Sequence, residues 1–200
     1  MKQLFFTFLV LLFPYSMAAQ DSDTAKEILD KVISTFKKDG SIQIDFDGTE
    51  HGSIIIKEEK FYLHSGQMQC WYDGNTLWSY VADTEEVNIS TPTHEELLSV
   101  NPYLILSNYQ TNFNCLYQGL TEHHGKQVYE ITLVPRRNGN KEKITIKISK
   151  SHYPVSIKVE QNHKMVSEIN IKSYQKQQIN DMVFRFNKSL YPNAEIIDLR

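Results

Sequence analysis

The sequence lacks the motifs that mark common catalytic sites, and it has few of the residues that build them. Among 200 residues there are only 2 cysteines, 8 glycines and 6 prolines. It contains no P-loop, no G-x-S-x-G turn, no G-x-G-x-x-G and no C-x-x-C. His94-Glu95 begins like a zinc-protease helix, but Leu98 stands where the second histidine belongs. We therefore expect no enzyme, no cofactor and no metal, although a hydrolase with an unrecognised site stays open.

Long apolar runs are absent beyond the N-terminus. There, Lys2 precedes the apolar run Leu4–Phe13, and small residues follow at Ser16–Ala19. The run is about half the roughly 20 residues that a membrane-spanning helix needs. This pattern is typical of a cleavable export signal. We expect a signal peptide at residues 1–19 and one domain at residues 20–200.

Neither cysteine lies near the expected cleavage site, since the first is Cys70 and the second is Cys115. A bacterial lipoprotein carries its lipid on a cysteine at that site, so we expect the mature protein to be free of lipid. In an oxidising compartment the two thiols could pair. Because the sequence does not place their Cα atoms, a Cys70–Cys115 disulfide stays open.

The charge balance excludes one class of partner. The formal net charge is -3, and removal of Lys2 leaves 20 basic against 24 acidic residues, or -4. Domains that bind nucleic acid usually carry a basic surface. We expect no nucleic-acid partner.

One helix should open the mature chain. Apolar residues recur at helical spacing from Thr24, which has capping-box spacing to Glu27, up to Asp39-Gly40, where the helix should end. The later Thr93–Tyr109 stretch reads as two short helical pieces, with Pro102 at the start of the second. Both helical regions need an apolar surface to cover.

Most of the remaining chain predicts strands. Apolar and polar residues alternate with period two in segments such as Ile42–Phe46, Ile144–Ile148 and Val155–Val159. Strands of this kind bury one face, which favours an antiparallel sheet. Turn signals such as Asp73-Gly74-Asn75 and Asn138-Gly139-Asn140 separate them. The fold class is therefore mostly β, with about 11 strands.

Several segments in unbroken order carry a resemblance to a known family. They are Gly52–Lys57, Asp73–Trp78 with Tyr80, Asn101–Leu106, Tyr129–Pro135, Val183–Phe186 and Glu195–Asp198. Together they resemble the outer-membrane lipoprotein carrier family, LolA. The resemblance implies an incomplete antiparallel β-barrel, strongly curved, whose open mouth is covered by short lid helices above an apolar cavity.

The same resemblance implies a function. A family member is a soluble, monomeric periplasmic chaperone that takes acylated lipoproteins from an inner-membrane ABC transporter of the LolCDE type. It shields their acyl chains on the way to the outer membrane, where the acceptor stays open. A lipid- or lipoprotein-sensing binding module on the same fold is the alternative.

Candidate cavity residues follow from the apolar faces of the expected elements. They are Leu29, Val32, Ile44, Phe46, Ile54, Ile56, Phe61, Leu63, Trp78, Tyr80, Tyr103, Leu104 and Leu106. Trp78 and Tyr80 could instead anchor their hairpin, and for every residue ordinary core packing is the alternative. One position departs from the family: Glu58 stands where many members have an arginine that bonds to the lid. The latch of this protein should therefore be different or missing.

Overall fold

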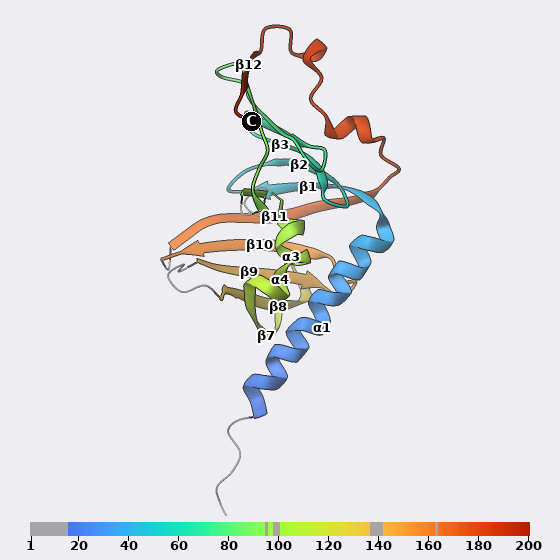
Figure 1. Ribbon diagram of the computed structural model, residues 1–200. Coiled ribbons are helices and arrows are strands. Elements are labelled where there is room, and N and C mark those ends of the chain that lie inside the picture. The colour runs from blue at the N-terminus through green and yellow to red at the C-terminus, as the bar shows by residue number, and fades with distance from the viewer. Residues whose placement is uncertain (1–15, 95, 98–100, 137–141, 163) are drawn as a thin grey trace, which may run out of the picture.

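The computed structural model describes residues 16–94, 96–97, 101–136, 142–162 and 164–200 (Figure 1). Most of the expected export signal therefore lies outside the described residues, as do Leu98 and the turn signal Asn138-Gly139-Asn140. Within the described residues, no helix is both long and apolar enough to cross a membrane.

The strands form one sheet of 12 strands. In sheet order they are β12 (Glu195–Asp198), β6 (Glu86–Ser90), β5 (Leu77–Val81), β4 (Met68–Tyr72), β3 (Lys60–Ser65), β2 (Gly52–Lys57), β1 (Ser41–Gly48), β11 (Lys164–Lys176), β10 (Pro154–Gln161), β9 (Glu142–Ser149), β8 (Lys126–Pro135) and β7 (Phe113–His123). Neighbours run antiparallel, except that β12 runs parallel to β6. Because β12 and β7 are separate edges, the curved sheet does not close. The predicted incomplete barrel is confirmed, with 12 strands where about 11 were expected.

Two runs of consecutive hairpins meet at the centre of this sheet. Strands β1 to β6 pair in chain order, and so do β7 to β11. The runs join where β1 pairs with β11, which places Ile44 opposite Tyr174 and Phe46 opposite Ile171. Residues more than a hundred positions apart thus share one apolar face.

The first helix, α1, spans Ser16–Asp39. Its predicted end is confirmed, because Gly40 has a φ of +76° and donates its backbone N–H to the Phe36 carbonyl over 3.2 Å. Its predicted start at Thr24 is wrong. No glycine or proline separates Ser16 from Thr24, so nothing in the sequence stops the helix from extending upstream.

Helix α1 lies across the face of the sheet that also carries α3 (Pro102–Ser107) and α4 (Tyr109–Asn112) (Figure 1). The main core lies between these helices and the inner face of the sheet. Leu29 and Val32 of α1 are fully buried in it, as are Ile131 and Ile148 of the sheet. The prediction that one stripe of α1 covers the apolar side of the sheet is confirmed.

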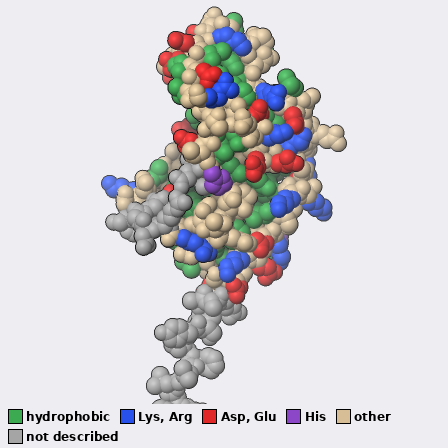
Figure 2. Space-filling model, in the orientation of Figure 1, with side chains coloured by type: hydrophobic (Ala, Val, Ile, Leu, Met, Phe, Trp, Pro, Cys, Tyr) green, Lys and Arg blue, Asp and Glu red, His purple; other side chains and the backbone are tan. Residues whose placement is uncertain are grey.

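A second cluster lies on the outer face. Trp71, Tyr80, Val87 and Ala194 form its buried part, and Tyr62, Trp78, Ile89, Phe186 and Tyr191 pack against it. The chain after β11 supplies three of these residues, since it passes through the short 3-10 helices η1 (Asp181–Phe184) and η2 (Lys188–Leu190) before β12. The outer cluster therefore holds the C-terminal segment against the sheet. On the side drawn in Figure 2, charged side chains of both signs surround smaller exposed hydrophobic areas.

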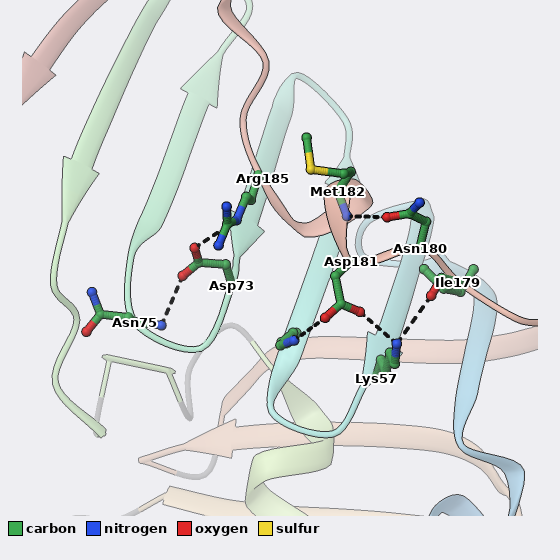
Figure 3. Close-up of polar contacts among 9 residues, drawn as sticks. Lys57, Asp73, Asn75, Ile179, Asn180, Asp181, Met182 and Arg185 are labelled. Atoms are coloured by element: carbon green, nitrogen blue, oxygen red, sulfur yellow. Dashed lines mark hydrogen bonds and ion pairs between the residues drawn. The ribbon is translucent and has the colours of Figure 1, made fainter.

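An ionic clamp fastens the start of this C-terminal segment (Figure 3). The Asp181 carboxylate lies 2.7 Å from Lys57 Nζ and 2.5 Å from Lys60 Nζ. Lys57 also donates to the Ile179 carbonyl over 3.3 Å, and Arg185 Nε lies 3.3 Å from Asp73. Hydrogen bonds from Lys57 and Lys60 lower the pKa of Asp181 to about 2.

We expect this clamp to weaken only in strong acid. The pKa of Asp181 is lower in the folded than in the unfolded protein, so its contribution is complete above about pH 4 and is lost as the pH falls towards 2. An NMR titration of the Asp181 carboxyl should give a midpoint near 2. In the Lys57→Met/Lys60→Met variant the midpoint should rise towards the ordinary value of about 3.9. An ordinary midpoint in the unmodified protein would contradict the clamp.

Candidate functional site

An apolar pocket of about 70 Å³ lies between α1, α3 and the inner face of the sheet. Its lining is Phe36, Ile44, Phe46, Ile54, Ile56, Tyr103, Leu106, Pro154, Ile157, Ile169, Ile171 and Tyr174. None of these side chains is charged, and the polar atoms among them are two tyrosine hydroxyls. Small apolar cavities of this kind bind apolar groups rather than water.

Four neighbouring strands shape the floor of the pocket. Ile44 pairs with Ile54 across β1 and β2, and Ile157 pairs with Ile169 across β10 and β11. Because side chains alternate between faces, β1 contributes Ile44 and Phe46, and β2 contributes Ile54 and Ile56, in each strand at every second position. A bulge in β11 opposite Asp45 and Phe46 keeps Ile171 and Tyr174 on the inner face together.

Helix α3 covers this floor. Asn101 caps it by accepting a hydrogen bond from the Tyr103 N–H over 3.0 Å, and Pro102 follows in the first turn, as predicted. Tyr103 and Leu106 are three positions apart, so both point from one side of the helix into the pocket. The Tyr103 ring also lies against Phe36 of α1, with 5.5 Å between ring centroids.

Six of the predicted cavity residues line this pocket. They are Ile44, Phe46, Ile54, Ile56, Tyr103 and Leu106. Leu29, Val32, Phe61, Leu63 and Leu104 belong to the same core cluster but do not line the pocket. For these five, the structure places the side chains in ordinary core packing.

Trp78 and Tyr80 do not lie at the pocket and need a correction. Both pack in the outer cluster, on the opposite face of the sheet. Leu77, their neighbour on β5, is in the inner core, and alternation turns the side chains of Trp78 and Tyr80 outward. The sequence left two roles open for Trp78 and Tyr80, cavity lining and anchoring of their hairpin. Their packing in the outer cluster fits anchoring of the hairpin.

Half of the pocket lining was missing from the sequence prediction. Phe36 comes from α1, and Pro154, Ile157, Ile169, Ile171 and Tyr174 come from β10 and β11. The alternation of Ile157, Ile169 and Ile171 predicted one buried face, which was the available signal. It did not reveal that β11 lies beside β1. Without that pairing, the C-terminal strands could not be assigned to the pocket.

The turn after β2 carries Glu58 where the resemblance implied an arginine that bonds to the lid. The charges of Glu59 and Glu58 add to burial in raising the pKa of Tyr103, so these carboxylates lie near α3. Separately, side-chain hydrogen bonds tie α4 to α1. The buried Tyr109 hydroxyl lies 2.8 Å from Asp30 Oδ1, and Gln110 Nε2 donates to the same atom over 3.2 Å.

Tyr109→Phe is expected to loosen this lid. The variant removes the hydroxyl that donates to Asp30 Oδ1 over 2.8 Å, with the Lys26 carbonyl a second acceptor at 3.3 Å, and that accepts from Gln110 over 3.2 Å. The lost contact between α4 and α1 is worth about 1 kcal/mol. Stopped-flow mixing with a fluorescent fatty acid should show association and dissociation each faster by about five-fold, because the cost of opening the lid falls. Tyr191→Phe is the matched control, since it removes a tyrosine hydrogen bond of 2.8 Å, to Gln69, in the outer cluster. Equal kinetics in both variants would contradict the latch.

Cys70 and Cys115 are not joined by a disulfide in this structure. Cys70 lies on β4 and Cys115 on β7, and both are buried free thiols. Burial raises the pKa of Cys70, and it raises that of Cys115 to about 11. Such thiols are protonated at neutral pH and react poorly. Over the described ranges, no three His, Cys, Asp or Glu side chains gather into a metal site.

Solved structures are similar to this chain at low identity. An uncharacterised conserved protein from Thermus thermophilus is 13% identical with a TM-score of 0.64, and the match covers 88% of this chain and 99% of that chain. The lipoprotein LppX from Mycobacterium tuberculosis is 13% identical with a TM-score of 0.48, covering 79% and 98%. The Pseudomonas aeruginosa MucA/MucB complex contains a chain that is 10% identical with a TM-score of 0.41, covering 80% and 60%.

No curated protein sequence matches the chain. A family model does match it, over residues 15–163, and its description is outer membrane lipoprotein carrier protein LolA. The match includes α1, the lid and the strands from β1 to β10. It thus spans well over half of the chain and most of the pocket lining. The chain therefore belongs to the LolA family of outer membrane lipoprotein carrier proteins.

Proposed function

We propose that this protein is a periplasmic carrier that shields the acyl chains of lipoproteins and moves them from the inner to the outer membrane. The observation that carries the proposal is the uncharged pocket beneath the short helix α3. A binding fold without a recognised catalytic group fits a carrier better than an enzyme.

Energetics explain why a small pocket suits a carrier. Burying ten methylenes contributes roughly 8 kcal/mol, so a preformed pocket for several chains would hold them too tightly for release. A pocket of about 70 Å³ must instead enlarge as the lid moves away from the sheet. The free energy spent on opening lowers the net affinity and allows delivery.

The lid has two features that suit such movement. Its helices are short, with α3 spanning Pro102–Ser107 and α4 spanning Tyr109–Asn112. The Nδ2 group of Asn101 is buried and has no hydrogen-bond partner among the described residues. An unpaired buried donor costs about 1–3 kcal/mol.

Two further parts of the proposal concern maturation and partners. We propose that residues 1–19 are removed on export, that the mature chain is a single unlipidated domain, and that a transporter of the LolCDE type supplies its cargo. N-terminal sequencing and intact-mass measurement of the periplasmic protein test the first two points. A mature chain beginning near Gln20 without added lipid mass is expected; a retained N-terminus or an added acyl mass would contradict them.

The central experiment is purification from the native periplasm followed by mass spectrometry of bound molecules. Acylated peptides or whole lipoproteins are the expected finding. The purified protein should also release lipoprotein from proteoliposomes that contain the transporter when ATP is added. Binding of lipid without such release would favour a sensing module. Absence of any bound lipid, together with no response to a hydrophobic dye, would overturn the proposal.

A further inference from the structure

A second, larger cavity adjoins the apolar pocket. It has a volume of about 470 Å³ and lies at the rim, between the end of α1, the turn after β2 and the chain after β11. Phe36, Ile56 and Tyr103 line both cavities. These three side chains are thus a shared wall, with the Phe36 and Tyr103 rings 5.5 Å apart.

The rim cavity differs from the apolar pocket in chemistry. Lys37, Lys57, Glu58 and Gln178 line it. Lys57 is held by Asp181 and the Ile179 carbonyl, so its ammonium is fixed at the cavity wall. Lys37 is exposed at the end of α1. The rim cavity therefore offers hydrogen-bond donors from Lys37, Lys57 and Gln178 beside one carboxylate, that of Glu58. Of the two lysines, Lys37 has no ion pair among the described residues.

We infer that the rim cavity binds the polar end of an acylated ligand whose head group accepts hydrogen bonds, such as a carboxylate, ester or amide. The chain then passes between Phe36, Ile56 and Tyr103 into the apolar pocket. This inference rests on the proposed function and adds to it the orientation of the ligand. Inside the apolar pocket the one further polar side chain is Tyr174, and its hydroxyl already donates to the Pro154 carbonyl over 2.6 Å. A polar head turned into the pocket would therefore lack a free donor.

Photocrosslinking tests the orientation directly. Two palmitate probes carry a diazirine, one beside the carboxylate and one at the methyl end. After irradiation, the carboxylate-end probe should label residues 37–41, 57–58 or 178–179, and the methyl-end probe should label 44–46, 154–157 or 169–174. Labelling in the opposite pattern, or the same pattern for both probes, would overturn the inference but leave acyl binding intact. Labelling that excess palmitate does not compete away would overturn the proposed function as well.

A pair of adjacent lysines gives a matched test of the charge. Lys37→Glu should weaken binding of palmitate by about five-fold, because it replaces a cation beside the carboxylate with an anion. It should leave binding of the uncharged palmityl alcohol unchanged. Lys38→Glu makes the same substitution at the next position of α1, outside the rim cavity, and should leave both affinities unchanged. Equal losses in the two variants, or equal losses for acid and alcohol, would overturn the inference.

Discussion

Ile169→Glu should weaken binding of a fluorescent acyl probe by about 100-fold. Ile169 lies on the pocket floor opposite Ile157, and it is only partly buried, so the fold should tolerate a polar side chain there. A carboxylate at this position draws water into the pocket and removes apolar contact with the chain. Losing contact with about four methylenes costs roughly 3 kcal/mol, which corresponds to the stated factor.

The control for this variant is Gln175→Glu, which adds the same charge to an exposed position of β11. Both proteins should unfold at similar urea concentrations, while only Ile169→Glu loses probe binding. If Ile169→Glu binds within about three-fold of the unmodified protein, the acyl chain does not occupy this pocket. If both variants lose binding, electrostatic repulsion of the probe is responsible instead.

Phe36→Ala should lower the free energy of unfolding by about 3–5 kcal/mol. The Phe36 ring is 7% exposed and lies within 5.5–6.3 Å, centroid to centroid, of the rings of Tyr103, Tyr153 and Tyr174. It thereby joins α1 to the lid, to β11 and to the residue that precedes β10. Truncation leaves a cavity in the shared wall and removes three aromatic contacts.

Urea denaturation with linear extrapolation measures this loss. Phe36→Leu keeps most of the volume and should lose less than half as much stability. Lys38→Ala changes an exposed position of the same helix and should stay within about 0.5 kcal/mol of the unmodified protein. A loss below about 1.5 kcal/mol for Phe36→Ala would mean that the helix end is held mainly by other contacts. The candidate for that role is Asp39, which lies 2.6 Å from Lys176 and accepts from Tyr153 over 2.5 Å.

The family, the fold class and half of the pocket could be predicted from local patterns. The period-two alternation of Ile42–Phe46 and the segment Gly52–Lys57 identified the strands that carry Ile44, Phe46, Ile54 and Ile56. The Asn101-Pro102 pair identified the start of α3, and helical spacing then placed Tyr103 and Leu106 on one side. These signals are local because dihedral preferences and side-chain periodicity involve neighbouring residues only.

The errors have a common physical origin. Alternation shows that Trp78 and Tyr80 share a face, but both faces of β5 carry apolar side chains, because the C-terminal segment covers the outer one. The start of α1 was placed too late, because a capping-box spacing inside a helix resembles one at its start. In each case, a correct local pattern had two structural explanations.

The sequence by itself determined which residues form strands, where the lid helix begins and which family the chain resembles. Only the tertiary structure decided that β11 lies beside β1, that α4 is held by Asp30, and that a polar cavity adjoins the apolar one. The physical reason is that these features depend on contacts between distant segments, such as Ile44 with Tyr174. Such contacts are selected by the packing of the whole sheet, and no local stretch of residues encodes them.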